Sequence, residues 1–149
     1  MEHLITPTEF FNCGLPVSDD ITTAEVDFAV NTVEQYFIVP FLGDLFGEIL
    51  DCESGSTYWD ILNAPDGLKM AMFHLTFAYL VYDKIRLTRY SSVIKNDEHS
   101  TDPSFADVKK ISNLHWEIGF SFLLKICEKL SIDTKAIQRN DLIFNELVY

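Results

Sequence analysis

Apolar residues recur at helical spacing in three stretches of the chain. The first stretch carries them at i, i+3, i+4, i+7 and i+11, which is typical of a helix with one buried face: Val26, Ala29, Val30, Val33 and Phe37. Thr22 and Glu25 stand three positions apart before this run, in the pattern of a capping box. Because a proline disfavours helical geometry at the preceding residue, Pro40 predicts that the helix from Thr23 ends near Ile38.

The second stretch predicts the longest helix, from Pro65 to about Leu87. A proline suits the first helical position, and an acidic residue such as Asp66 suits the first turn. Apolar side chains occupy two of its faces: Leu68, Ala71, Met72, Leu75, Tyr79 and Tyr82 on one, and Met70, Phe73, Phe77 and Leu80 on the other. A helix that is apolar nearly all round is buried among neighbours, so we expect it at the centre of the fold.

The third stretch predicts a helix from about Pro103 to Leu130, with one apolar stripe: Phe105, Val108, Ile111, His115, Ile118, Phe122, Ile126 and Leu130. Shorter helices are expected at Asp44–Leu50 and Thr57–Leu62. The β-branched residues within Tyr90–Lys95 favour a short strand, followed by a polar loop.

These patterns predict an all-α fold, a helical bundle with two long helices, two or three shorter ones, one short strand or loop excursion and extended termini. The 149 residues suit a single domain. We expect an N-terminal arm at 1–20, a helical body at 21–131 and a C-terminal tail at 132–149. The tail ends in an apolar run that either folds back on its own domain or docks on a neighbour: Ile143, Phe144, Leu147, Val148 and Tyr149.

Charge is distributed very unevenly along the chain. Residues 1–63 hold 12 of the 23 acidic residues and none of the 11 Lys and Arg, so the whole formal charge of −12 lies in this part. A chain this acidic is a poor candidate for binding the phosphates of nucleic acids, because affinity for phosphates comes from Lys and Arg. Negative charge that is concentrated in one part of a protein favours a functional face over a surface that only aids solubility. The candidates for an acidic face are Asp19, Asp20, Glu25, Asp27, Glu34, Asp44 and Glu48.

No motif for catalysis, cofactor binding or metal binding is present. His74 and His115 belong to no metal-binding pair on a helix, and the pattern favours partly buried, hydrogen-bonded histidines. Cys13, Cys52 and Cys127 fit no zinc or redox spacing, which indicates reduced thiols in an intracellular chain. No signal peptide is evident at the N-terminus, and no apolar run approaches the length of a bilayer span. We therefore expect a soluble protein without enzymatic activity, cofactor or metal.

The order of these features resembles the small helical head–tail connector, or adaptor, proteins of tailed bacteriophages. The resemblance covers roughly residues 21–130 and rests on the helix pattern and three local strings: Tyr36-Phe37-Ile38-Val39-Pro40-Phe41-Leu42-Gly43, Tyr58-Trp59-x-Ile61-Leu62 and Arg89-Tyr90-Ser91-Ser92-Val93-Ile94-Lys95-Asn96-Asp97-Glu98-His99-Ser100. No diagnostic motif is among them, and the arm and the tail are not covered.

The resemblance implies a structural virion protein of the neck, assembled in the host cytoplasm. Such connectors form rings, typically twelve-fold, below the portal; they extend the DNA channel and provide a platform for the tail. The implied partners are further copies of the chain, the portal and tail proteins, and genomic DNA that passes without specific binding, with no membrane involved. Two other classes stay open: an acidic helical regulator that mimics DNA, and a small helical enzyme with an unrecognised site.

Overall fold

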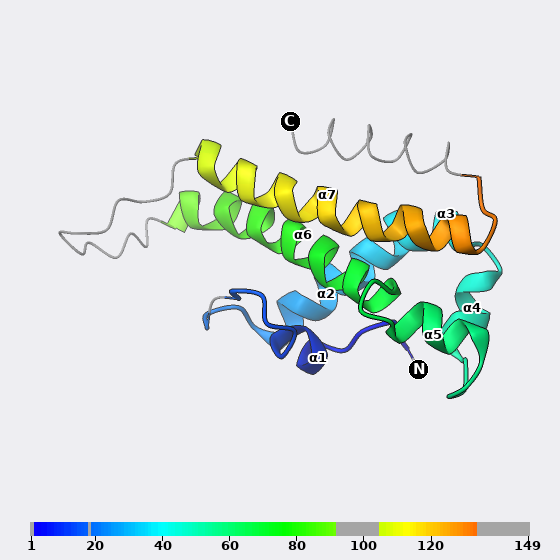
Figure 1. The fold of residues 1–149 in the computed structure, drawn as a ribbon. Helices are drawn as coiled ribbons and strands as arrows, with labels where there is room; N and C mark the ends of the chain where they lie inside the picture. Colours follow the sequence, from blue (N-terminus) through cyan, green and yellow to red (C-terminus); the bar gives the residue numbers. More distant parts are fainter. Residues whose placement is uncertain (1, 18, 92–104, 134–149) are drawn as a thin grey trace.

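The computed structural model describes residues 2–17, 19–91 and 105–133 (Figure 1), and over these ranges it contains helices and no strand. The elements in chain order are α1 (Pro7–Phe11), α2 (Thr23–Val33), the π-helix η1 (Glu34–Ile38), α3 (Val39–Leu42), α4 (Leu45–Leu50), α5 (Thr57–Asn63), α6 (Leu68–Ser91) and α7 (Phe105–Lys129). The all-α prediction is thus confirmed for the described part. Tyr90 and Ser91, expected to begin a strand, instead end α6. The rest of the expected strand, its polar loop and the C-terminal tail from residue 134 lie outside the described residues.

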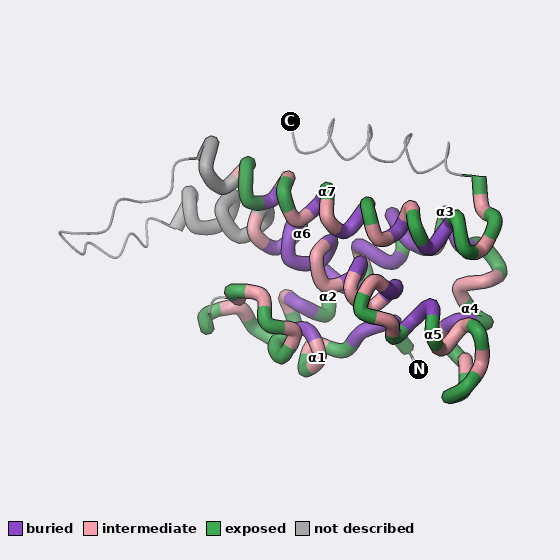
Figure 2. Tube along the Cα trace, viewed as in Figure 1, coloured by how far each residue is buried: buried purple, intermediate pink, exposed green. Residues whose placement is uncertain are grey.

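Helix α6 lies at the centre of the fold, as predicted. No residue from Gly67 to Val81 is exposed. Figure 1 shows α7 running along one side of α6 and α2 lying on another side, and in Figure 2 the buried residues gather where these helices face one another. The elements that precede α6 therefore form one layer, the N-terminal layer, and α6 and α7 together form the other.

The face and start of α2 are confirmed, but its expected end is wrong. Thr22 and Glu25 form the capping box, and all five residues of the apolar stripe are buried. The helical path then continues through Pro40, because η1 intervenes. In this π-helix the Val39 N–H donates to the Glu34 carbonyl, five residues back. The wider turn makes room for the proline ring, which in an α-helix clashes with the carbonyl four residues back. The path ends at Gly43, in a positive-φ conformation.

Helix α6 begins at Leu68, three residues later than predicted. Pro65 and Asp66 occupy the middle of a turn that the Gly67 N–H closes by donating to the Ala64 carbonyl at 2.8 Å. A Cβ at Gly67 would lie 2.6 Å from the Ile61 carbonyl oxygen. Proline and aspartate at this place therefore indicate a tight turn between α5 and α6, and not the first turn of the long helix.

Residues 2–17 do not form the extended arm that we expected. Thr6 and Glu9 form a capping box with Pro7 at the first helical position, and α1 follows. Leu4, Ile5 and Phe10 are fully buried in the main core. The same capping pattern that located α2 is present here, but only five residues follow it, too few to show a helical period.

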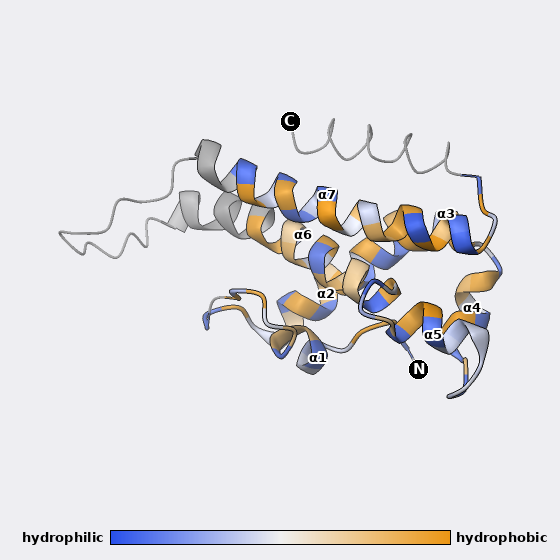
Figure 3. Ribbon diagram, in the orientation of Figure 1, coloured by the Kyte–Doolittle hydropathy of each residue, from blue (hydrophilic) through white to orange (hydrophobic). Residues whose placement is uncertain are grey.

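The buried face of α7 differs from the predicted stripe. Over residues 109–129, where the structure describes the side chains of α7, the buried residues are Ser112, Trp116, Gly119, Phe120, Leu123, Ile126 and Cys127. Of these, Ile126 alone belongs to the predicted stripe, whose members Phe105 and Val108 lie outside the described side chains. Figure 3 shows hydrophobic and hydrophilic residues mixed along α7. Two small residues of the buried face, Ser112 and Gly119, lie directly against α6. The Ser112 hydroxyl donates to the Ala78 carbonyl at 2.9 Å, and a Cβ at Gly119 would lie 2.7 Å from Leu75 Cγ.

Candidate interaction surfaces

Metal ligands do not gather among the side chains that the structure describes. Nowhere in residues 2–17, 19–81 and 109–133 do three His, Cys, Asp or Glu side chains come together as metal ligands would. Within the same ranges, no helix has the length and apolar character needed to cross a membrane. Polar contacts that join the layers and surfaces that remain exposed are therefore the features to consider.

Glu34 is a buried carboxylate that holds the N-terminal segment against η1. It is 1% exposed. One of its oxygens accepts the Leu4 N–H at 2.5 Å, and the other accepts from His3 Nδ1 at 2.7 Å. Burial by itself lowers the pKa of His3, but the hydrogen bond to Glu34 and the nearby carboxylates outweigh burial and raise it overall.

This burial removes Glu34 from the predicted acidic face. The sequence does contain a signal for its position, because Glu34 follows Val30 by four residues and so falls on the apolar stripe of α2. A charged residue at such a position needs a buried partner, and residues 3 and 4 supply it.

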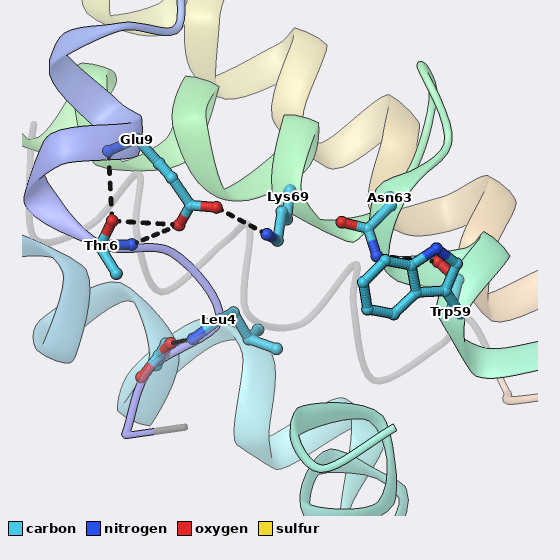
Figure 4. A network of polar contacts seen from close by, with 7 residues as sticks. Leu4, Thr6, Glu9, Trp59, Asn63 and Lys69 are labelled. Carbon is cyan, nitrogen blue, oxygen red and sulfur yellow. Dashed lines mark hydrogen bonds and ion pairs between the residues drawn. The ribbon is translucent and has the colours of Figure 1, made fainter. Parts of the chain in front are cut away.

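A second polar contact ties α1 to the central helix (Figure 4). Lys69 Nζ lies 2.7 Å from Glu9 Oε1, while Glu9 Oε2 accepts the Thr6 N–H at 2.8 Å. Burial tends to raise the pKa of Glu9, but the hydrogen bonds from Lys69 and Thr6 lower it overall. Figure 4 also shows the Asn63 amide donating to the Trp59 carbonyl at the end of α5.

Most of the other predicted acidic residues are at the surface. The exposed ones are Asp19, Asp20, Asp27, Asp44 and Glu48, and they come from the loop before α2, from α2, from the residue before α4 and from α4. Glu25 is half-buried and accepts the Thr22 N–H at 2.7 Å in its capping box. A hydrogen bond to Glu48 raises the pKa of Tyr58. The part of the chain that carries these carboxylates contains no Lys or Arg, because the first basic residue is Lys69 in α6.

His74 and His115 are partly buried and hydrogen-bonded, as the sequence predicted, and the structure adds that they bond to each other between α6 and α7. Their Nδ1 atoms lie 2.9 Å apart, and the two rings are nearly parallel, at 18°. Since one Nδ1 must donate and the other accept, the two neutral imidazoles are in opposite tautomers. Burial lowers the pKa of both, and the charge of His115 lowers that of His74 further. A proton on both nitrogens at once would break the contact.

Apolar side chains also remain at the surface. On α7, Ile111 is 43% and Leu114 54% exposed, while Ile118 and Phe122 are half-buried. With 100° per residue, these four residues form one stripe, about a third of a turn from the face that meets α6. Two aromatic residues, Phe28 of α2 and Tyr36 of η1, are more than half exposed. The five apolar tail residues predicted as an interface lie beyond the described part of the chain.

Comparison with known proteins gives no relative: no family model matches the chain, and neither a curated protein nor a solved structure shows significant similarity to it.

Proposed function

We propose that the protein is a head–tail connector, a ring-forming structural protein that sits below the portal of a tailed phage, extends the DNA channel and supports the tail. It acts without enzymatic activity, cofactor or metal. Its partners are further copies of itself, twelve in the simplest ring, together with portal and tail proteins. The order of helices that resembles such connectors supports this proposal.

The distribution of charge is the main observation that supports a connector. Five candidate carboxylates are exposed on the N-terminal layer, and no Lys or Arg occurs in residues 1–63. Duplex DNA carries one negative charge per roughly 1.7 Å of its axis. A basic channel wall would bind the phosphates and hold the DNA, whereas an acidic wall repels them and lets the DNA slide. The alternative use of the same surface in a connector is contact with a basic neighbour.

We assign the tail from Leu142 to Tyr149 to subunit or partner contacts, because it ends in a run of apolar residues and apolar surfaces commonly mark interaction sites. Deleting these residues should weaken assembly more than it lowers the stability of the subunit. Sedimentation gives the first quantity and thermal unfolding the second. Equal assembly with and without residues 142–149 would remove the tail from the interface.

Electron microscopy of the purified protein tests the proposal as a whole. We expect closed rings with a central opening, and a matching density at the neck of the parent particle. Protein that stays monomeric or dimeric at high concentration, over a range of salt concentrations, would contradict the connector assignment.

The second candidate is an acidic protein that occupies the DNA-binding surface of a basic partner. Phe28 and Tyr36, exposed on the same layer as the carboxylates, favour it, because aromatic residues are enriched in protein interfaces. A monomer or dimer that competes with DNA for a basic host protein would support this function over the connector.

A further inference from the structure

Two apolar stripes lie on the surface of the described part of the chain, one on each layer. The α7 stripe consists of Ile111, Leu114, Ile118 and Phe122, and the α2 stripe consists of Phe28 and Thr32 of α2 with Tyr36 of η1. We propose that the α7 stripe of one subunit packs antiparallel on the α2 stripe of a second copy of the chain. This inference rests on the proposed function, because it names the contact between neighbouring subunits of the ring.

The α2 stripe is apolar in spite of its threonine. Residues four apart on a helix lie about 40° apart around its axis, so Phe28, Thr32 and Tyr36 share one side. The Thr32 hydroxyl already donates to the Phe28 carbonyl at 2.8 Å, so it needs no partner from outside. The rings of Phe28 and Tyr36, both more than half exposed, provide most of the apolar surface.

The spacing of the two stripes matches when the helices run in opposite directions. In each stripe, three side chains follow one another at intervals of four residues, which spans about 12 Å along an α-helix. When the central residues of the two sets face each other, the outer residues also meet. The facing pairs are Thr32 with Ile118, Phe28 with Phe122, and Tyr36 with Leu114.

Charge complementarity selects the antiparallel register over the parallel one. Lys125 is exposed three positions after the last residue of the α7 stripe, and Glu25 stands three positions before the first residue of the α2 stripe. The antiparallel register places these opposite charges against each other. A parallel register would instead place Lys125 against Val39 and Glu25 against Ile111, so both charges would face apolar side chains.

The contact joins different copies of the chain. The two stripes do not cover each other within one subunit, since Phe28, Tyr36 and Leu114 are all exposed there. A contact between two different surfaces of identical subunits repeats from copy to copy, and it closes into a ring when the rotation between neighbours allows this. Helix α4, with its exposed Asp44 and Glu48, is not part of the contact, which is compatible with carboxylates that face the channel.

Disulfide trapping between copies tests the contact in the full chain. Serine first replaces the two half-buried cysteines, Cys13 and Cys52, whereas the buried cysteine of α7 stays. In this background Thr32→Cys is combined with Ile118→Cys. The matched control combines Thr32→Cys with Glu128→Cys, an exposed position about 15 Å further along α7.

Under mild oxidation, the first variant should form a ladder of cross-linked dimers, trimers and larger species. The control should form only background products, because a disulfide requires Cα atoms within about 7 Å of each other. Equal cross-linking of the two variants would overturn the proposal. A product that stops at the dimer would overturn it as well, because the proposed contact repeats around the ring.

Sedimentation gives a second readout that needs no cysteine. Leu114→Asp and Phe28→Asp each place a charge inside the proposed contact, so each should raise the protein concentration needed for half-assembly on the order of tenfold. The matched controls Asn113→Asp and Asn31→Asp add the same charge on the same helices but outside the stripes, and they should assemble like the natural chain. Thermal unfolding verifies that all four variants fold.

The two readouts separate this inference from the proposed function. Closed rings that assemble equally well in all four variants would remove this contact and leave the connector standing. A natural chain that does not assemble at any concentration would overturn both.

Discussion

Gly119 sets the distance between the two long helices. A Cβ at this position would meet Leu75 Cγ at 2.7 Å and the Ala71 carbonyl oxygen at 3.2 Å. We therefore expect Gly119→Ala to lower the free energy of unfolding by about 1–3 kcal/mol, although alanine favours a helix by up to ~1 kcal/mol over glycine. Chemical denaturation measures the difference. The control is Ser121→Ala, at an exposed position of the same helix, which should be neutral or slightly stabilising. Equal stability of both variants would show that α6 and α7 do not approach closely here.

His3 gives the N-terminal segment a dependence on pH. Its pKa is raised in the folded protein, so its contribution to stability is complete below the ordinary value of 6.5 and is lost as the pH rises through the folded value. The stability difference between the natural protein and His3→Gln should therefore be larger at pH 6 than at pH 8.5, as denaturation at the two pH values measures. Glu34→Gln should reduce this dependence, because it removes the strongest interaction that favours the protonated ring, while the charges of Asp27 and Glu2 remain.

The pair of His74 and His115 makes stability depend on pH in the opposite direction to His3. The pKa values of His74 and His115 are lowered, so the unfolded chain binds protons more readily and stability falls as the pH drops below 6.5. We expect His74→Gln to flatten the stability curve between pH 7 and pH 5. If His74→Gln loses as much stability between pH 7 and pH 5 as the natural protein does, other groups cause that loss. The control His3→Gln should still lose stability over this range.

At the scale of the element, sequence reasoning succeeds where one face is apolar and fails where two are. For α2 the capping box and a single stripe determine both the start of the helix and its buried side. For α7 two adjoining faces are apolar, and periodicity alone cannot say which one meets α6. The small residues Ser112 and Gly119 mark the face that lies against α6. A search for apolar residues alone overlooks them. The helix end predicted from Pro40 is wrong, because the π-helix η1 accommodates the proline ring and the helical path continues.

A pair of substitutions tests which face of α7 is in the core. Leu123 is fully buried, so Leu123→Ala should cost about 2–5 kcal/mol of unfolding free energy. Glu128→Ala, at an exposed position on the same helix, should stay within about 0.5 kcal/mol of the natural protein. Urea denaturation of the two variants measures both values. Similar costs at the two positions would contradict the burial of Leu123.

At the scale of the whole molecule, the sequence locates the excess charge but not its geometry. The absence of Lys and Arg from residues 1–63 is visible without a structure, and five of the seven candidate carboxylates are exposed. The capping box that engages Glu25 can be read in the sequence, and so can the place of Glu34 on the apolar stripe of α2. The partner of Glu34 cannot, because its contact with Leu4 joins residues 30 positions apart in the chain.

The charge layout predicts how assembly depends on salt. In a ring of twelve, the segments 1–63 would bring together 12 × 12 = 144 formal negative charges. The Debye length falls from roughly 30 Å at 0.01 M salt to roughly 10 Å at 0.1 M, so moderate salt screens their repulsion. We expect sedimentation to show more assembled protein at 0.1 M than at 0.01 M NaCl. The triple variant Asp27→Asn, Asp44→Asn, Glu48→Gln should assemble at lower salt, because it lacks three exposed charges per subunit. Docking on a basic partner has the opposite sign, since screening removes an attraction. Assembly of the purified chain that weakens as salt rises would therefore contradict an acidic channel wall and favour pairing of these carboxylates with a basic surface.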